Sequence, residues 1–305
     1  MAAEPTVSLS PERLAGAHGN RLAGDLWIAE GARDAAPVLL LHGGGQTRRA
    51  WDRVARDLAG DGYAALTVDQ RGHGDSEWAE DGAYSFWDYA ADAVSLNRQM
   101  RERFGATPII IGASLGGIAG MLAEGKAGPD FWSAMILVDI TPAMDPEGVE
   151  KIQSFMGAAM ADGFETIEEA ADAVAQYLPN RPRPKSFDGL RKNLRQGPDG
   201  RLRWHWDPQF LSGPRGINTG RENAEAEMNA ALRGMSSPLL LVRGASSELI
   251  SPEHVAALQT IVPHLETVDV GGAGHMVAGD RNDIFSAAIR SFLTKRKANA
   301  AGGKT

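Results

Sequence analysis

The chain has 305 residues, of which 43% are hydrophobic, so it can bury a sizeable core. A formal net charge of -8 argues against a general nucleic-acid-binding protein, which needs a basic surface. The sequence contains no cysteine, which excludes disulfides, thiolate metal sites and a cysteine nucleophile.

The first residues of the chain are not expected to form a secretory signal. Met1 to Pro11 lack the basic stretch and apolar run of a secretory signal. No segment approaches the roughly 18 consecutive apolar residues that span a bilayer. We therefore expect a cytoplasmic protein that does not contact membranes, either a monomer or a homodimer. Residues 296–305, basic and then rich in Ala and Gly, are expected to form a flexible tail.

Short apolar segments alternate along the chain with amphipathic ones. The apolar segments lack polar alternation, as strands buried on both faces of a parallel sheet do. They are Pro37–Leu41, Ala64–Val68, Pro108–Ile111, Ala134–Val138 and Pro238–Val242, and the helical patterns include Arg48–Gly60, Ser85–Phe104 and Leu115–Gly125. This order predicts an α/β fold with a mostly parallel, twisted sheet flanked by helices. Leu22–Ala29 alternates more and predicts part of an antiparallel N-terminal hairpin.

The alternation stops between residues 143 and 234. Helical patterns dominate this region, at Gly148–Ala161, Thr166–Tyr177 and Glu222–Arg233. An all-helical insertion between two strands is what a cap over an active site would look like. We therefore expect a core of residues 1–142 and 235–295, with a helical cap at residues 143–234.

A candidate nucleophile lies where a buried strand turns into a helix, in Ile109–Gly117. The turn has the pattern G-x-S-x-G, in which the serine lies on a strained backbone and side chains at the glycines would clash. The turn exposes the Ser114 hydroxyl, and the Leu115 N–H at the helix start can donate to a developing oxyanion. The alternative is a glycine-rich turn with an idle serine. The strand–turn–helix context favours Ser114 as the nucleophile.

A serine nucleophile needs a base and a carboxylate that orients the base. His275 follows the candidate strand Glu266–Val270 and a glycine-rich loop, where the base is expected. Glu248 occupies the usual position of the acid, although Asp is commoner there. Asp139, at the end of the preceding strand, is the alternative acid. We expect Glu248 in this role and keep Asp139 open.

A second oxyanion donor is expected in the glycine-rich loop His42-Gly43-Gly44-Gly45, which ends a predicted strand. The most suitable group is the N–H of Gly44. A phosphate-binding loop would instead need Lys-Ser/Thr after the glycines, and a dinucleotide site would need G-x-G-x-x-G. The loop has neither pattern.

Four motifs, in this order, resemble the α/β-hydrolase family in its capped, single-domain branch. They are His42-Gly43-Gly44-Gly45, Asp69-Gln70-Arg71-Gly72-His73-Gly74-Asp75-Ser76, Gly112-Ala113-Ser114-Leu115-Gly116 and Gly274-His275. The resemblance covers about residues 20–295. It implies a hydrolase with a helical lid and with neither metal nor cofactor. Glu248, where this family usually has Asp, is the departure that leaves the acid open.

The residue at the nucleophile position narrows the reaction. Epoxide hydrolases and haloalkane dehalogenases of this fold use Asp where this chain has Ser114, so acyl transfer to water is expected. We predict hydrolysis of a small to medium apolar or aromatic carboxylic ester, a small-molecule substrate, through an acyl-enzyme on Ser114. A lactonase, a carbon–carbon bond hydrolase and a non-catalytic ligand-binding homologue are the alternatives.

Three consecutive residues of the expected cap, Trp204, His205 and Trp206, are candidate walls of the substrate pocket. Two indoles flanking an imidazole could hold an aromatic or apolar acyl group. The alternative role for this segment is packing between the cap and the body.

Overall fold

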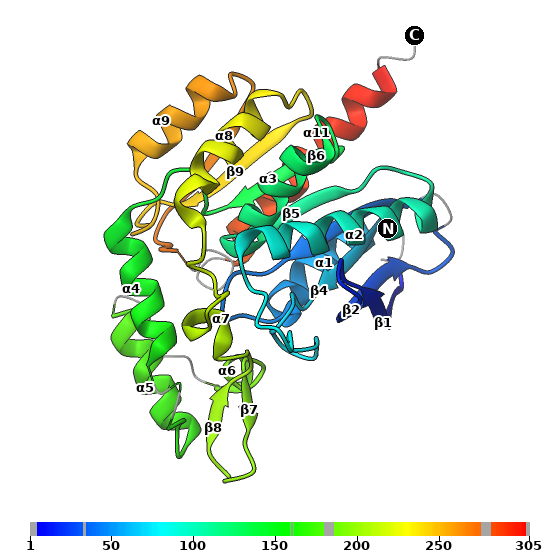
Figure 1. The fold of residues 1–305 in the computed structure, drawn as a ribbon. Helices are drawn as coiled ribbons and strands as arrows, with labels where there is room; N and C mark the ends of the chain where they lie inside the picture. The colour runs from blue at the N-terminus through cyan, green and yellow to red at the C-terminus, as the bar shows by residue number, and fades with distance from the viewer. Residues whose placement is uncertain are drawn as a thin grey trace.

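The computed structural model describes residues 5–32, 35–158, 160, 162–179, 186–275 and 282–302. An eight-stranded sheet forms the centre of the molecule, and helices lie on both of its faces (Figure 1). Among the described residues, no helix is both long enough and apolar enough to cross a membrane.

The sheet has the strand order β1-β2-β4-β3-β5-β6-β9-β10. β1 and β2 form the expected antiparallel hairpin, β2 is antiparallel to β4, and the remaining neighbours pair in parallel. The strands are β1 (Val7–Ala15), β2 (Arg21–Ala29), β3 (Ala36–Leu41), β4 (Tyr63–Val68), β5 (Ile109–Ala113), β6 (Ala134–Val138), β9 (Leu239–Gly244) and β10 (Glu266–Val270). The predicted α/β fold is confirmed.

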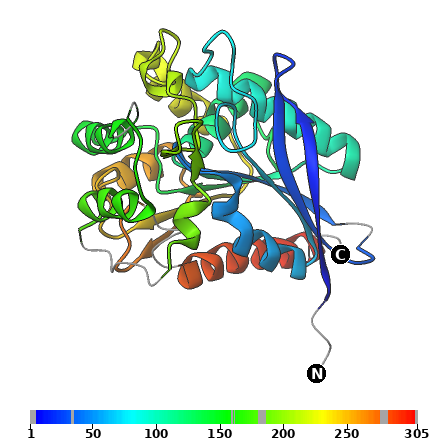
Figure 2. The same ribbon diagram turned by 90° about the horizontal axis from the view of Figure 1, so that it is seen from below.

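The central strands are apolar throughout because each of their faces lies in a different core. In β3, Leu39 and Leu41 join one core cluster, whereas Val38 and Leu40 join the other. The first cluster is covered by α2 (Phe86–Phe104), α3 (Leu115–Ala127), α8 (Ala224–Arg233) and α9 (Pro252–Ile261). The second is covered by the 3-10 helix η1 (Arg48–Trp51), α1 (Asp52–Gly60) and α11 (Asn282–Gly302), of which α1 and α11 lie together below the sheet in Figure 2.

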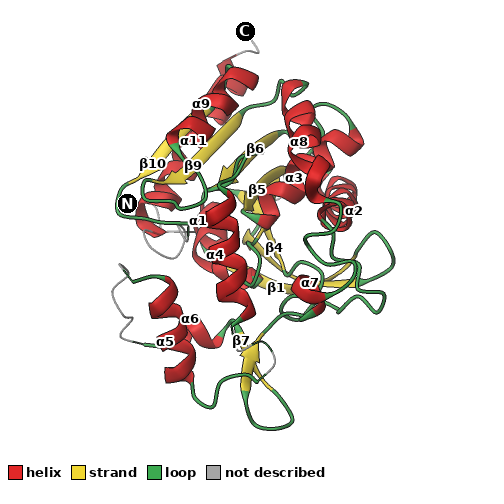
Figure 3. Cartoon of the chain, turned by 60° about the vertical axis from the view of Figure 1, so that its left-hand side comes forward, coloured by secondary structure: helices red, strands yellow, loops and turns green. Residues whose placement is uncertain are grey.

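A long segment separates β6 from β9, although the two strands are neighbours in the sheet. It contains α4 (Pro146–Gly157), α5 (Ile167–Tyr177), α6 (Asp188–Arg191), the hairpin of β7 (Leu194–Gln196) and β8 (Leu202–Trp204), α7 (Gln209–Ser212), η2 (Arg221–Asn223) and α8 (Figure 3). The insertion is therefore not all-helical as expected. Strands of three residues are too short to show a clear alternation in the sequence.

Two further differences concern the expected domain limits. Helix α8 packs against α3 in the layer that covers the sheet, although its residues fall within the cap range predicted from the sequence. Helix α11 continues to Gly302, so most of the expected flexible tail is helical. The last three residues of that tail lie outside the described residues.

Candidate active site

Ser114 lies at the tight turn between β5 and α3. Its backbone has φ 43° and ψ -111°, a combination that residues other than glycine rarely adopt. The Ser114 N–H donates to the Val138 carbonyl at 3.1 Å, and the Ser114 carbonyl accepts from Gly117 and Ile118 in the first turn of α3. The residue is half-buried, so a small molecule can reach it.

The glycines on either side of Ser114 are required by close packing. A Cβ on Gly112 would overlap the backbone of Gly116, and a Cβ on Gly116 would overlap the Leu41 carbonyl of β3. A side chain at either position would push α3 away from the sheet. The G-x-S-x-G spacing thus follows from how closely the helix that begins after Ser114 approaches two strands.

The glycine-rich loop after β3 lies beside Ser114. A Cβ placed on Gly43 would be 3.5 Å from the Ser114 Cβ. The Gly43 N–H donates to the Gln46 Oε1 at 3.1 Å, and the Gly45 N–H donates to the His73 Nε2 at 3.1 Å. Within the described part of the chain, the Gly44 N–H has no hydrogen-bond acceptor. Leu115, as the first residue of α3, has no intrahelical acceptor for its own N–H.

Two buried histidines hold this loop. His73 accepts from Gly45 through Nε2 and donates from Nδ1 to the Arg71 carbonyl at 3.0 Å. His42 accepts the Gln70 N–H at Nε2 and contacts the Gly43 carbonyl through Nδ1 at 2.8 Å. Burial lowers the pKa of His42 to about 4 and that of His73 to about 3. Both rings are therefore neutral near pH 7, which leaves Nε2 free to accept.

His275 meets a carboxylate at the end of β6. Its Nδ1 lies 2.7 Å from Asp139 Oδ2, with Asp139 fully buried and the imidazole 8% exposed. The Asp139 carboxylate also accepts from the Gly244 N–H at 2.8 Å and from the Ser247 hydroxyl at 2.6 Å. Asp139 has φ 48°, a second rare backbone conformation at this edge of the sheet. These contacts orient the imidazole so that its Nδ1–H donates a hydrogen bond to the carboxylate.

The position of Glu248 corrects the expectation that it lies against the imidazole. Its Oε1 accepts from the Tyr177 hydroxyl at 3.1 Å, and its Oε2 accepts from the backbone N–H of His275 at 3.4 Å, not from the imidazole. The loop after β9 places Ser247 rather than Glu248 beside Asp139. The contact with the ring is therefore made by Asp139, the alternative that the sequence left open.

The Trp204, His205 and Trp206 segment does not act as one wall. The Trp204 ring packs edge-to-face against Phe155 and Phe164, inside the insertion, with centroids 5.6 and 5.2 Å apart. Trp206 is nearer to the oxyanion loop, because its Nε1 would be 3.7 Å from a Cβ on Gly45. The backbone N–H of His205 donates to the Asn193 carbonyl and its carbonyl accepts from Gly74, while the side chain is half-buried.

Two apolar residues near the loop were not anticipated from the sequence. A Cβ on Gly44 would be 3.4 Å from the Phe210 ring and 3.7 Å from the Met156 methyl group. Phe210 also packs edge-to-face on the His73 ring, 5.0 Å between centroids. Neither residue belongs to a recognisable motif, and only the folding of the insertion over the sheet brings them to the loop.

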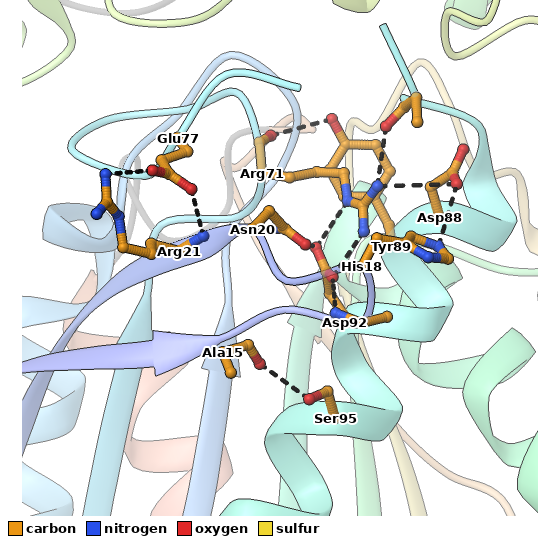
Figure 4. Close-up of polar contacts among 12 residues, drawn as sticks. Ala15, His18, Asn20, Arg21, Arg71, Glu77, Asp88, Tyr89, Asp92 and Ser95 are labelled. Carbon is orange, nitrogen blue, oxygen red and sulfur yellow. Dashed lines mark hydrogen bonds and ion pairs between the residues drawn. The ribbon is translucent and has the colours of Figure 1, made fainter. Parts of the chain in front are cut away.

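The Asp69–Ser76 motif has a structural role around the site. Asp69 accepts from the backbone of Asp75 at 2.9 Å and forms an ion pair with the buried Arg48, which follows the oxyanion loop. Arg71 forms two hydrogen bonds to Asp92 of α2, at 2.7 and 2.6 Å (Figure 4). These buried pairs fix the segment that carries His73.

The groups gathered at this edge of the sheet are those that acyl transfer requires. They are the Ser114 hydroxyl, the neighbouring Gly44 N–H, which has no acceptor among the described residues, and an imidazole held by a carboxylate. In the portion of the chain that is described, no cluster of three or more His, Cys, Asp or Glu side chains could hold a metal ion.

Comparisons with known proteins agree on the family. The model of the family described as alpha/beta hydrolase fold matches residues 36–281. An esterase of Mycobacterium tuberculosis is 30% identical over 264 residues, covering 85% of this chain and 83% of that protein. The 3-hydroxybutyrate-oligomer hydrolase of Cupriavidus necator is 32% identical over 252 residues, covering 78% and 82%. The crystal structure of E-2-(acetamidomethylene)succinate hydrolase superposes with a TM-score of 0.76 at 26% identity, covering 94% of this chain and 100% of that one.

The family model spans most of the chain, and the two relatives named above are an esterase and an oligomer hydrolase. The sheet order and the serine turn described above are consistent with this relationship. The chain therefore belongs to the alpha/beta hydrolase family and is an esterase-like hydrolase.

Proposed function

We propose that the protein hydrolyses small to medium apolar or aromatic carboxylic esters through an acyl-enzyme on Ser114. The observation that carries the proposal is the strained turn at Ser114 beside the Gly44 N–H, which has no acceptor among the described residues. A rare backbone conformation is retained only where the surrounding structure enforces it. An unbonded N–H next to a hydroxyl is a ready donor for a developing oxyanion.

In this mechanism Asp139, rather than Glu248, orients the base. The hydrogen bond from Nδ1 to Asp139 leaves the lone pair of His275 on Nε2. Nε2 takes the proton of the Ser114 hydroxyl as its oxygen attacks the ester carbonyl. The carboxylate stabilises the imidazolium that forms, while the Ser247 and Gly244 donors keep Asp139 in place.

The tetrahedral oxyanion is stabilised by the N–H groups of Gly44 and Leu115. When it collapses, the carbon–oxygen bond to the alcohol breaks, and the alcohol leaves with the proton of His275. A water molecule then gives a proton to His275 and attacks the acyl-enzyme. His275 returns that proton to the Ser114 oxygen as the carbon–oxygen bond to Ser114 breaks, which releases the carboxylic acid and restores the enzyme. Loss of one such donor costs about 3 kcal/mol of transition-state stabilisation in comparable enzymes.

The preference for apolar substrates is supported by the side chains next to the oxyanion loop. Phe210 and Met156 contact Gly44, and Trp206 lies beside Gly45 and packs against Phe210. An acyl or alkoxy group of a substrate bound at Ser114 in front of this loop would contact these apolar side chains rather than charged ones. Trp204 is left out of this pocket because it packs within the insertion.

We assign the cap to the insertion from α4 to α7 and count α8 with the core, because α8 packs on α3. The cap is attached to the body near the site by a specific contact. The Tyr84 hydroxyl donates to Asp207 Oδ2 at 2.6 Å, and the Asp207 N–H donates to the Gly72 carbonyl at 2.8 Å. These bonds hold the segment that carries Trp206 and Phe210 over the oxyanion loop.

A substrate panel tests the proposal. Purified protein and its Ser114→Ala variant are assayed with p-nitrophenyl esters of increasing acyl length, aromatic esters, lactones and a vinylogous diketone. We expect turnover of the esters and its loss in the variant. Exclusive turnover of lactones or of the diketone would replace ester cleavage with a lactonase or carbon–carbon hydrolase activity. Binding without turnover of any compound would indicate a non-catalytic homologue.

A further inference from the structure

Glu248 bridges two parts of the site that are far apart in the sequence. One of its carboxylate oxygens accepts from the Tyr177 hydroxyl at the end of α5, and the other accepts from the backbone N–H of His275. We propose that Glu248 is a positioning residue that ties the loop of His275 to the cap. Its carboxylate holds the base and the acyl-binding side chains of the cap in one arrangement. The proposal rests on the esterase function proposed above.

The backbone of Glu248 is already anchored to the start of the cap. The Asp145 N–H, at the beginning of α4, donates to the Leu249 carbonyl at 3.0 Å. Gly148 in the first turn of α4 lies so close that a Cβ there would overlap the Glu248 carbonyl. The carboxylate therefore extends from a fixed backbone, and its contacts to Tyr177 and His275 have defined geometry.

The contacts continue from Tyr177 to the oxyanion loop. The Tyr177 ring stacks on Phe155 with centroids 4.3 Å apart and planes at 10°. The next residue in α4 is Met156, whose methyl group would be 3.0 Å from a Cβ on Gly45. Two helices of the cap thus connect the Glu248 carboxylate with the loop that carries the oxyanion donor.

This series of contacts has a consequence for substrate selection. An acetyl group on Ser114 extends less far toward the cap than a longer acyl chain does, so binding of the longer chain depends more on where cap side chains such as Met156 lie. Loss of the Tyr177 hydroxyl frees α5 from Glu248 but leaves Asp139 on the imidazole. The chemical step should then survive, and binding of long acyl groups should weaken.

The test compares Tyr177→Phe with a matched control, Tyr63→Phe. The control also removes one tyrosine hydroxyl, but that hydroxyl donates to the Leu293 carbonyl on the opposite side of the sheet. We expect Tyr177→Phe to lower kcat/KM for p-nitrophenyl octanoate by about 5-fold to 10-fold, mainly through KM, the size expected for the loss of one ordinary hydrogen bond. The value for p-nitrophenyl acetate should change less than about 2-fold, within the effect of a neutral substitution. Tyr63→Phe should leave the ratio of the two substrates unchanged. Equal losses with both esters, or no loss with either, would overturn the proposal.

A double-mutant cycle separates this proposal from the esterase function itself. The free energies of unfolding of Tyr177→Phe, Glu248→Ala and the double variant are measured in urea, without any substrate. We expect non-additive effects, the double variant being no less stable than Glu248→Ala. Additive effects would mean that the two side chains do not act together and would overturn the link. Coupling without ester turnover would retain the link and reject only the proposed reaction.

Discussion

Asp139→Asn is the substitution that separates the two candidate acids. The Asp139 carboxylate accepts from Gly244, Ser247 and His275, and an Asn carbonyl in place of Oδ1 would keep the Gly244 bond. The amide nitrogen in place of Oδ2 cannot accept from Nδ1–H. The imidazole would therefore shift its proton to Nε2 and lose the lone pair with which, in the proposed mechanism, it deprotonates Ser114.

The magnitude follows from this change of tautomer. A triad with unchanged geometry and the wrong tautomer loses about 10⁴ in kcat, which corresponds to about 5.5 kcal/mol of activation free energy. Glu248→Gln should lose less than about 10-fold, because the described partners of the Glu248 carboxylate are the Tyr177 hydroxyl and a backbone N–H.

Steady-state kinetics with p-nitrophenyl butyrate measure both variants, and circular dichroism verifies that each is folded. A large loss in Glu248→Gln, together with near-normal kcat in Asp139→Asn, would refute the assignment of the acid. Equal and moderate losses in both would also contradict it, since of these two carboxylates Asp139 is the one that contacts the ring.

Two further predictions concern stability. The pKa values of His42 and His73 in the folded protein lie below the unfolded value of 6.5, so on acidification these rings bind protons in the unfolded chain before they do in the folded one. The free energy of unfolding therefore falls as the pH drops below about 6.5, by up to about 1.4 kcal/mol per pH unit for each ring. Urea denaturation between pH 7 and pH 5 should show this slope, and His73→Gln should reduce it. Gly116→Ala should destabilise by about 3 kcal/mol or more, because the methyl group overlaps the Leu41 carbonyl. Gly60→Ala, with open space at Cβ, is the matched control.

Each of these stability predictions has a clear contrary result. A slope that His73→Gln leaves unchanged would mean that this ring is not held neutral by burial. A Gly116→Ala variant as stable as Gly60→Ala would mean that α3 does not approach β3 as closely as the packing around Ser114 indicates.

The sheet and the serine turn could be predicted because local sequence determines them. Strands buried on both faces are uniformly apolar, and their helices show helical spacing, so β3 to β6 were recognisable from short segments. The turn at Ser114 needs glycines at fixed distances, which leaves a visible pattern. Both features depend on residues close together in the chain.

The acid could not be chosen from the sequence because tertiary contacts decide it. Asp139 and Glu248 each follow a strand that ends at the same edge of the sheet, and both lie near His275. What separates them is the Ser247 hydroxyl, which takes the position beside Asp139, and the Tyr177 hydroxyl, which binds Glu248. These partners come from distant segments and carry no motif.

The pocket side chains were hard to predict for a similar reason. Trp204 and Trp206 are two residues apart, yet one packs inside the insertion and the other lies near Gly45. A regular strand would place these two side chains on the same face, but β8 ends at Trp204, and a three-residue strand gives too little pattern to reveal where Trp206 lies. Phe210 is proposed as a pocket residue only because a Cβ on Gly44 would be 3.4 Å from its ring.

Covalent labelling of Ser114 tests the central claim most directly. The folded protein and its Ser114→Ala variant are treated with a fluorophosphonate, and the intact mass and the modified peptide are determined. The proposed mechanism predicts one adduct per chain, located on Ser114 and missing from the variant. A folded protein that takes up no label, or a variant that is labelled as fast as the wild type, would contradict the assignment of Ser114 as the nucleophile.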